Sequence, residues 1–318
     1  MPSLVEIEAA AAVVQATMPP TPQYAWPLLA ARLGCEVWVK HENHTPIGAF
    51  KIRGGLNYLH RLRAERRRVN GLVSATRGNH GQSLALACRL HGVPLTIVVP
   101  HGNSREKNAA MQAFGARLVE HGEDFEAARQ HAIALAARDG LEMVPSFHRD
   151  LVCGVATYAL ELLRAAPALD TVYVPLGLGS GLCGMILVRD LLGLKTEVVG
   201  AVAENAPAYA RSFAAGHAVA TDSAATFADG VACRVPDPDA LSIILRGAAR
   251  IVTVPEADIA AAIGMYYTDT HQLAEGAGAI ALAALAGERA RQAGRRVGVV
   301  LSGGNIDRDV YLRVLGAS

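Results

Sequence analysis

The sequence alternates between short apolar runs and longer stretches with helical periodicity, and this alternation restricts the possible folds more than any other feature. Several of the short runs, such as residues 197–203, are apolar at consecutive positions instead of at every second one. Strands that are covered by helices on both faces of a parallel sheet show this pattern. The sequence therefore predicts an α/β fold with doubly wound, mostly parallel sheets.

The same pattern predicts strands at residues 36–40, 72–75, 95–99, 171–175, 197–203, 251–254 and 297–301. It predicts helices at residues 52–68, 82–91, 106–114, 123–138, 154–164 and 181–192. Because the chain of 318 residues is longer than one small core requires, we expect two lobes with a cleft between them. Residues 71–145 carry a strand–helix alternation of their own, so we predict a large domain from residues 1–69 and 149–318 and a small domain from residues 70–148.

Charge and hydropathy argue against several classes of protein. The 30 Lys and Arg residues nearly balance the 29 Asp and Glu residues, and the resulting net charge of +1 argues against nucleic-acid binding. We interpret the one basic run, Arg61, Arg63 and residues 66–68, as a solvated helix face. The longest nearly apolar stretch, residues 276–287, is shorter than the about 20 residues of a membrane-spanning helix. No signal peptide is recognisable, and we expect a cytoplasmic protein without a membrane or nucleic-acid partner.

Cysteine and histidine residues give no metal-binding pattern. The 5 cysteines are scattered and form no C-x-x-C pair, so we predict free, mostly buried thiols. His41 and His44 lie three residues apart but have no further ligand nearby in the sequence. We therefore predict no metal site.

Three glycine-containing loops follow predicted strands at the points where helices begin. Their sequences are TRGNHG at residues 76–81, GLGSGLCG at residues 177–184 and LSGGN at residues 301–305. Because ligands of open α/β sheets bind at the carboxyl ends of the strands, we expect the three loops to meet at one crevice.

The loop at residues 177–184 is the best candidate for an anion site. Its glycines allow backbone N–H groups to face one ligand, and a helix is predicted to begin near Gly181. A Gly-x-Gly-x-x-Gly spacing of a dinucleotide fold is nearly matched, but the strand after it offers no acidic residue for a ribose. A phosphate group is the ligand that we expect.

Lys51 stands between Phe50 and Ile52, beside glycines and at the start of a predicted helix. Desolvation in such an apolar setting lowers the pKa of a lysine, as Schiff-base chemistry requires. In isolation, the segment is better explained by a surface lysine whose aliphatic chain packs along the helix.

Four motifs taken together favour the Schiff-base interpretation of Lys51 over the surface lysine. AFKIRG at residues 49–54, GNHGQ at residues 78–82, GLGSG at residues 177–181 and SGGN at residues 302–305 occur in this order. The chain thereby resembles the pyridoxal-phosphate enzymes of the tryptophan-synthase-β fold type, specifically the threonine dehydratase and serine racemase family. The resemblance extends from about Pro20 to the C-terminus, and we expect a short form without a regulatory domain.

The resemblance implies a role for each matching residue. Lys51 would form the covalent link to pyridoxal phosphate and act as the catalytic base, and Phe50 would lie against the cofactor ring. Asn79 would contact the phenolic oxygen and Ser302 the pyridine nitrogen. The phosphate would be held by Gly177, Leu178, Gly179, Ser180 and Gly181. The substrate would be bound by Thr76, Arg77, Asn79 and His80. A homodimer is usual for the family.

The sequence departs from the family at several positions. Arg77 stands where serine racemases have a serine that serves as a second base, and arginine remains protonated. Arg77 could instead bind the α-carboxylate or an anionic side chain of the substrate, or face solvent. Val155 replaces a glutamine near the substrate, and His-Arg-Asp at residues 148–150 replaces the usual acidic pair. These two changes together point to an aryl or a second carboxylate group on the substrate. Asp229 matches a metal-binding turn of racemases, but Ala225 replaces its glutamate, so no metal is expected. Glu275 matches a segment near the cofactor ring, and a supporting role and a structural ion pair are both open.

We therefore expect a pyridoxal-phosphate-dependent ammonia-lyase that converts a β-hydroxy L-amino acid to a 2-oxo acid and ammonia. The substrate would be of the threonine or serine type, or an analogue such as phenylserine or 3-hydroxyaspartate. A β-replacement synthase and an amino-acid racemase of the same fold are the alternatives. A non-catalytic binder and a nicotinamide-dependent enzyme both leave Lys51 unexplained.

Overall fold

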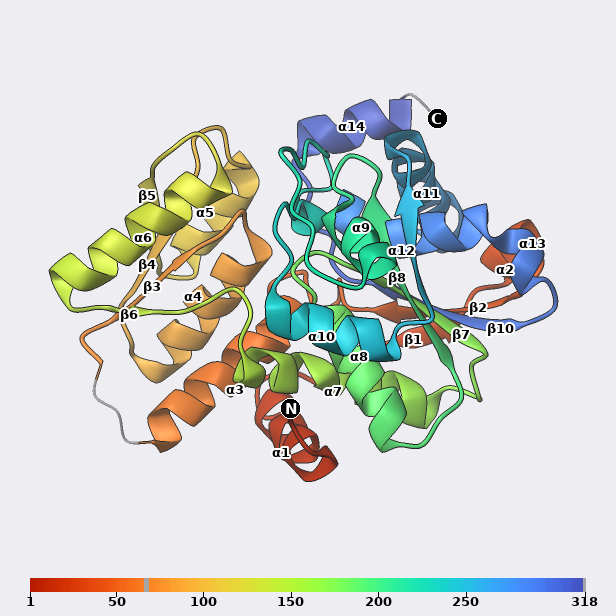
Figure 1. Cartoon of the computed structure of the whole chain (residues 1–318), viewed down its shortest axis with the longest axis horizontal. Helices are drawn as coiled ribbons and strands as arrows, with labels where there is room; N and C mark the ends of the chain where they lie inside the picture. The colour runs from red at the N-terminus through yellow and green to blue at the C-terminus, as the bar shows by residue number, and fades with distance from the viewer. Residues whose placement is uncertain (66–68, 317–318) are drawn as a thin grey trace.

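The computed structural model describes residues 1–65 and 69–316 and contains two β-sheets flanked by helices (Figure 1). The larger sheet has the strand order β1-β2-β10-β7-β8-β9, and its strands are parallel except for β1, which is antiparallel to β2. Its strands are β1 (Gln23–Ala25), β2 (Glu36–His41), β7 (Thr171–Pro175), β8 (Glu197–Ala203), β9 (Arg250–Val254) and β10 (Arg296–Leu301).

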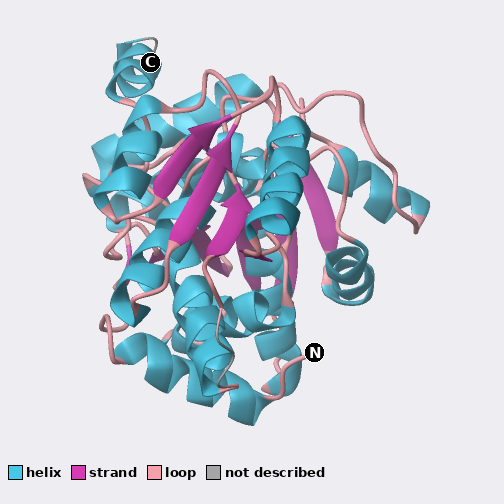
Figure 2. Cartoon of the chain, turned by 90° about the vertical axis from the view of Figure 1, so that its left-hand side faces the viewer, coloured by secondary structure: helices cyan, strands magenta, loops and turns pink. Residues whose placement is uncertain are grey.

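The smaller sheet has the order β5-β4-β3-β6 and is entirely parallel. Figure 2 looks toward this side of the molecule, where helices surround the strands. The strands are β3 (Leu72–Ala75), β4 (Leu95–Val99), β5 (Arg117–Glu120) and β6 (Glu142–Met143). Two mostly parallel sheets confirm the predicted α/β fold class.

The helices connect successive strands and cover both sheets (Figure 1). From the N-terminus to the end of the smaller sheet they are α1 (Leu4–Gln15), α2 (Pro27–Leu33), α3 (Lys51–Ala64), α4 (Asn79–His91), α5 (Arg105–Ala113) and α6 (Phe125–Asp139). The remaining ones are α7 (Arg149–Ala165), α8 (Ser180–Leu191), α9 (Ala208–Ala215), the short η1 (Asp229–Val231), α10 (Pro238–Gly247), α11 (Glu256–Thr270), α12 (Gly276–Gly287), α13 (Arg289–Gln292) and α14 (Arg308–Gly316).

The consecutive apolar residues of β8 explain why the larger sheet is covered on both faces. Val199 and Ala201 belong to a core that includes α11 and α12, whereas Val198 and Val202 belong to a second core with α7 and α8. Successive side chains of a strand point to opposite faces, so each face has its own apolar layer.

The predicted strands all form, with ends that differ by one residue at most, whereas β1, β5 and β6 were not predicted. These three strands are short and lack a run of consecutive apolar residues, which explains why the pattern gave no signal. Helix α7 begins five residues before the predicted position, because His148 caps it by accepting a hydrogen bond from the Asp150 N–H. Helix α3 ends at Ala64 instead of Arg68, and residues 66–68 lie outside the described residues.

The smaller sheet is built from residues within 72–143, and the larger sheet from residues before and after this segment. This order of the strands agrees with an inserted small domain, and the exact division at residues 70–148 stays a prediction. Helix α3 contacts both α4 and α7, so it lies against helices from both parts of the chain.

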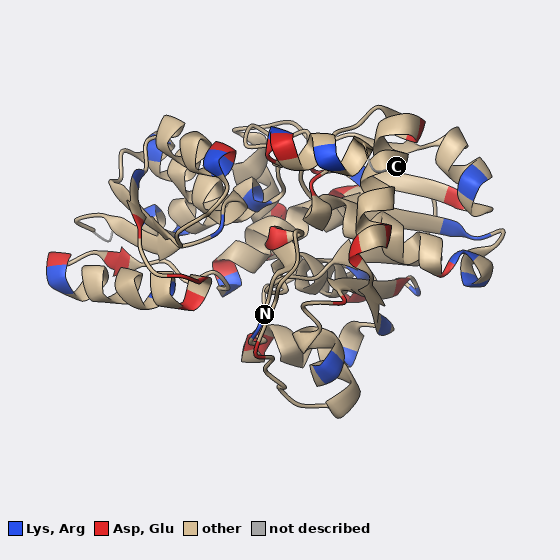
Figure 3. Cartoon of the chain, turned by 90° about the horizontal axis from the view of Figure 1, so that it is seen from above, with Lys and Arg blue, Asp and Glu red and all other residues tan. Residues whose placement is uncertain are grey.

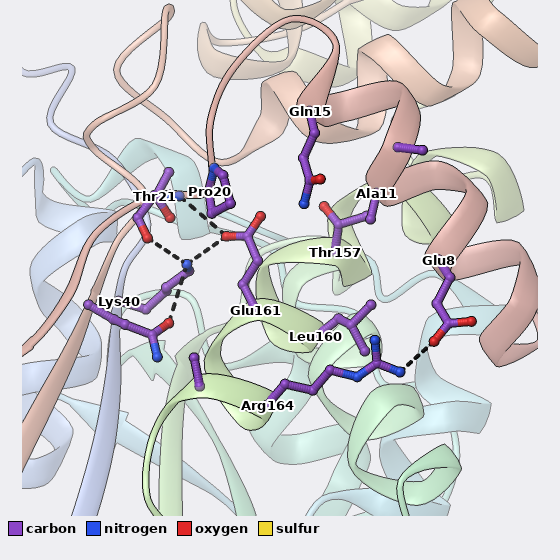
Figure 4. A pocket seen from close by; sticks show the side chains of 13 residues that line it. Glu8, Ala11, Gln15, Pro20, Thr21, Lys40, Thr157, Leu160, Glu161 and Arg164 are labelled. Atoms are coloured by element: carbon purple, nitrogen blue, oxygen red, sulfur yellow. Dashed lines mark hydrogen bonds and ion pairs between the residues drawn. The ribbon is translucent and has the colours of Figure 1, made fainter.

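A buried ionic network fixes the start of α3 relative to β2 and α7. Arg53, which is fully buried, pairs with Glu42 at 2.7 Å and with Glu161 at 2.7 Å. Lys40 pairs with the same Glu161 at 2.6 Å and donates to the Thr21 carbonyl at 2.9 Å. Figure 4 shows Lys40 and Thr21 directed toward Glu161 at the wall of a cavity of about 620 Å³. Two cations and two carboxylates balance each other in this network.

Basic and acidic residues are interspersed over the molecule (Figure 3). Of the predicted basic run, Arg61 lies near Glu6 and Asp150, at 3.9 and 3.8 Å. All five cysteines are free and buried, as predicted. Within residues 1–65 and 69–316, no helix combines the length and the apolar character that crossing a membrane requires.

Candidate active site

The three glycine-containing loops meet at one pocket with a volume of about 880 Å³. Residues that follow β3, β7 and β10 line it together with the start of α3. The pocket contains every residue that the sequence predicted for the site: Phe50, Lys51, Thr76, Arg77, Asn79, His80, Gly177, Leu178, Gly179, Ser180, Gly181 and Ser302. The carboxyl ends of parallel strands bring these distant segments together.

Lys51 lies at the first position of α3 and extends into the pocket. Its Nζ atom donates a hydrogen bond to Ser180 Oγ at 2.9 Å and lies 4.9 Å from the centre of the Phe50 ring. Desolvation lowers the pKa of Lys51 from 10.5 to about 8. An amine with such a pKa is partly neutral near neutral pH and can act as a nucleophile or a base.

The loop before α8 requires glycine at two positions. Gly179 has a left-handed φ of 103°, and a Cβ atom there would lie 2.8 Å from the Cβ atom of Ala240. A Cβ atom on Gly177 would lie 2.4 Å from the Gly230 carbonyl oxygen. Gly179, the N-cap residue of α8, has no side chain to cap the helix, so within the described residues the first N–H groups of α8 are available to a ligand. Tyr209 fixes the loop by donating to the Leu178 carbonyl at 3.0 Å.

The loop after β10 packs against the segment that leads to Lys51. The Phe50 N–H donates to the Ser302 carbonyl at 3.0 Å, and Ala49 forms an antiparallel bridge with Gly303. The Ser302 hydroxyl donates to the Ala277 carbonyl at 3.2 Å. Because of these contacts, the end of β10 and the start of α3 hold fixed positions relative to each other.

Asn79 begins α4, and both ends of its side-chain amide are bound. Its Nδ2 atom donates to Glu275 Oε1 at 2.6 Å, and its Oδ1 atom accepts from Asn305 at 2.8 Å. Glu275 also forms an ion pair with Lys107 at 3.0 Å. The two interpretations of Glu275 therefore both have support, since it is paired and it contacts a residue of the predicted cofactor site.

Arg77 and His80 line the pocket with polar atoms that have no partner among the residues that the structure describes. Within the described residues, the Arg77 side chain forms no hydrogen bond and no ion pair. His80 Nε2 is buried and has no hydrogen-bond partner in residues 1–65 and 69–316, and burial together with the charge of Lys51 lowers the pKa of His80 to about 3. His80 is therefore neutral at physiological pH. Thr76 turns the loop by accepting a hydrogen bond from the Gly78 N–H at 3.0 Å.

Sequence reasoning missed Lys107, Arg234 and Asp124, which line the pocket from elsewhere in the chain, and it did not foresee that Asp229 pairs with Lys107. Lys107 contacts both oxygens of Asp229, at 2.7 and 2.6 Å, and Arg234 pairs with Asp124 at 3.1 Å. These partners are more than 100 residues apart, and no local motif marks them. Asp229 thus contacts an ammonium group in this structure, and in the described part of the chain no group of three or more His, Cys, Asp or Glu side chains is arranged to hold a metal ion.

The geometry fits a cofactor that combines a phosphate group with an aldehyde. The glycine loop and the uncapped start of α8 provide N–H donors for the phosphate, and the loop has no space for side chains at Gly177 and Gly179. The desolvated amine of Lys51 lies beside this loop and can react with a carbonyl carbon. The fold and the pocket therefore define an enzyme of pyridoxal phosphate chemistry.

Comparisons with known proteins identify the family. The model of the family described as "Pyridoxal-phosphate dependent enzyme" matches residues 14–303. L-threonine ammonia-lyase of Thermotoga maritima is 32% identical over 289 residues, which cover 91% of this chain and 72% of that protein. L-threo-3-hydroxyaspartate ammonia-lyase of a Pseudomonas species is 34% identical over 296 residues, covering 93% of this chain and 92% of that protein. The structure of maize serine racemase superimposes with a TM-score of 0.91 at 26% identity, covering 99% of this chain and 97% of that one.

The chain therefore belongs to the family of pyridoxal-phosphate-dependent enzymes. Its cofactor is pyridoxal phosphate, and it is a lyase of the ammonia-lyase type. The resemblance to threonine dehydratases and serine racemases that the motifs indicated is confirmed.

Proposed function

We propose that the chain is a dehydratase for a β-hydroxy L-amino acid with a second carboxylate, of the 3-hydroxyaspartate type. The reaction would yield a 2-oxo acid and ammonia, with water lost in the elimination and regained in the final hydrolysis. The observation that carries this proposal is the Arg77 guanidinium group, which lines the pocket without a protein partner among the described residues.

The other cations of the pocket already contact carboxylates. Lys107 pairs with Asp229, Arg129 pairs with Glu126 at 2.7 Å, and Arg234 pairs with Asp124. Apart from Lys51, Arg77 is the one pocket cation in the described residues without a carboxylate partner. Arginine stays charged and binds carboxylates through two parallel hydrogen bonds. A dicarboxylic substrate would supply the missing partner, and the similarity to the Pseudomonas 3-hydroxyaspartate ammonia-lyase supports the same class.

We assign the proposed roles from the family resemblance to residues that the structure places in the pocket. The N–H groups at the start of α8, with Gly177, Leu178, Gly179, Ser180 and Gly181, would hold the cofactor phosphate. Phe50 would pack against the cofactor ring, Asn79 would contact its phenolic oxygen and Ser302 its nitrogen. Lys51 would carry the covalent link.

Bound pyridoxal phosphate supplies an electron sink that makes the α-C–H group of an amino acid acidic. Lys51 Nζ, with its pKa lowered to about 8, would accept the α-proton. Ser180 Oγ, at 2.9 Å, would orient this amine. The loop of Thr76, Arg77, Asn79 and His80 would bind the substrate, with Arg77 on the side-chain carboxylate. Neutral His80 adds no charge that would compete for this carboxylate.

A substrate with an aryl side chain is the second candidate, because the apolar residues Phe125, Ile133 and Phe147 also line the pocket. Racemisation remains the alternative reaction, and the family includes serine racemases, but a permanently protonated Arg77 gives no second base. We also propose that the protein acts as a cytoplasmic homodimer, with residues 70–148 as its small domain.

The test is the release of 2-oxo acid by purified protein loaded with pyridoxal phosphate. The panel contains L-threonine, L-serine, L-threo-phenylserine and L-threo-3-hydroxyaspartate, each with its D-enantiomer. We expect turnover of 3-hydroxyaspartate and no racemisation. Turnover restricted to phenylserine would favour the aryl candidate, and a requirement for an added nucleophile would identify a synthase instead.

A further inference from the structure

Lys107 connects the smaller sheet to the loops that carry the cofactor site. It lies in α5, whereas its partners Asp229 and Glu275 belong to η1 and to the N-cap of α12. Its Nζ atom lies 2.7 and 2.6 Å from the two Asp229 oxygens and 3.0 Å from Glu275 Oε2. One ammonium group therefore joins two carboxylates from different segments.

The Lys107–Glu275 pair is excluded from water. The Lys107 side chain is 6% exposed and that of Glu275 is 3% exposed, whereas that of Asp229 is 26% exposed. The aliphatic part of Lys107 also packs on Gly78, where an added Cβ atom would lie 2.4 Å from Lys107 Cδ. Burial raises the pKa of Glu275, and the charge of Lys107 opposes this effect. Without the ammonium group, Glu275 would be a buried carboxylate without a cation.

Glu275 in turn determines how the Asn79 amide is oriented. Glu275 Oε1 accepts from Asn79 Nδ2 at 2.6 Å, and Asn79 Oδ1 accepts from Asn305 Nδ2 at 2.8 Å. The Asn305 amide is itself fixed, because it donates to the Ile47 carbonyl at 2.8 Å. An ionised carboxylate can only accept hydrogen bonds, so it holds the NH₂ side of Asn79, whereas a protonated one could donate to the oxygen side.

We propose that Lys107 is a positioning residue of the cofactor site, which acts by keeping Glu275 ionised and thereby fixing the donor side of the Asn79 amide. The inference rests on the proposed place of Asn79 beside the cofactor. The second proton of Asn79 Nδ2 is then available for an oxygen of pyridoxal phosphate. Asp229, the more exposed partner, helps to hold the Lys107 ammonium in place.

The test measures binding of pyridoxal phosphate instead of turnover. We expect Lys107→Met to weaken cofactor binding about tenfold or more, because it leaves a buried carboxylate uncompensated. The absorbance spectrum of the bound cofactor should also change, because Asn79 loses its fixed orientation. Lys107→Arg, which keeps the charge, should restore most of the affinity. Lys195→Met is the matched control, because Lys195 is exposed and should leave both measurements unchanged.

A double-mutant cycle with Glu275→Gln separates positioning from general stability. If Lys107 acts through Glu275, then adding K107M to E275Q causes no further loss of affinity. The inference would be overturned if K107M lowered the affinity for the cofactor equally in the wild-type and E275Q backgrounds, or if K107M left the absorbance spectrum unchanged. Should K107M alone fail to fold, the K107M/E275Q protein is expected to fold and to bind the cofactor as E275Q does. A double variant that does not fold, or that binds the cofactor more weakly than E275Q, would also overturn the inference. A wild-type protein that binds the cofactor but releases no 2-oxo acid contradicts the proposed function and leaves this inference intact.

Discussion

Lys51 and Ser180, which are 129 residues apart in the sequence, are joined by a hydrogen bond of 2.9 Å between Nζ and Oγ. This contact brings the start of α3 to the start of α8. It places a desolvated amine beside the helix N-terminus that is suited to bind a phosphate. The pair therefore connects the two functions that the site combines, which are covalent attachment and anion binding.

Replacement of Lys51 by alanine should abolish both the visible absorbance of covalently attached pyridoxal phosphate and the release of 2-oxo acid. The amine is required for the link and for the proton transfer, so neither property should survive. The measurement is an absorbance spectrum of the variant together with the 2-oxo acid assay. A Lys51→Ala protein that retains both would contradict the proposed role of this residue.

The attachment rate of pyridoxal phosphate to cofactor-free protein should depend on pH through the Lys51 amine. Desolvation lowers the pKa of this group to about 8, so the reactive neutral form increases as the pH rises. The rate should rise about tenfold between pH 7 and pH 9 and then level off. An ordinary lysine would give a rise of about a hundredfold without a plateau in this range, and stopped-flow absorbance distinguishes the two profiles.

Arg77→Ala should lower kcat/KM for L-threo-3-hydroxyaspartate by about 10- to 100-fold, because the side-chain carboxylate loses a charged hydrogen-bond partner. The effect on L-serine, which has no second carboxylate, should be much smaller. Arg77→Lys tests whether a positive charge alone is sufficient to bind the side-chain carboxylate or whether the planar guanidinium group is needed. Equal losses for both substrates would show that Arg77 does not distinguish the side chain.

Gly179→Ala should weaken cofactor binding by about tenfold or more. The substitution forces an L-residue into a φ of 103° and places a Cβ atom 2.8 Å from Ala240, so the phosphate loop must shift. Gly193→Ala is the control, because its φ of 66° is also left-handed but no atom of the described residues lies within 4 Å of the added Cβ atom. It should reduce the free energy of unfolding by about 1 kcal/mol without changing the affinity for the cofactor.

Arg53→Met should lower the free energy of unfolding by about 3–5 kcal/mol, because Glu42 and Glu161 lose their shared buried cation. Arg164→Met removes an exposed ion pair with Glu8 and should change stability by less than about 1 kcal/mol. Urea unfolding of the two variants measures the difference. A similar loss of unfolding free energy in both variants would show that the buried network contributes no more to stability than a surface ion pair.

The sequence predicted the parts of the fold and site that depend on local pattern. The central strands were recognisable because burial on both faces requires consecutive apolar residues, and the three loops were expected to meet because parallel strands end at one edge. The short strands β1, β5 and β6 carry no such signal. The pairing of Lys107 with Glu275 joins residues that are distant in the sequence, and no local pattern around either residue indicates the contact.

The position of β10 has a consequence for how the enzyme is made in the cell. This strand, residues 296–301, lies between β2 and β7 in the middle of the larger sheet, although it follows the other described strands in the sequence. The larger sheet therefore cannot close before residues 296–301 have been synthesised, and Ser302 joins the site only after that point. Binding of the cofactor at the finished pocket accordingly has to wait for β10, and a nascent chain that stops before β10 would remain without the cofactor.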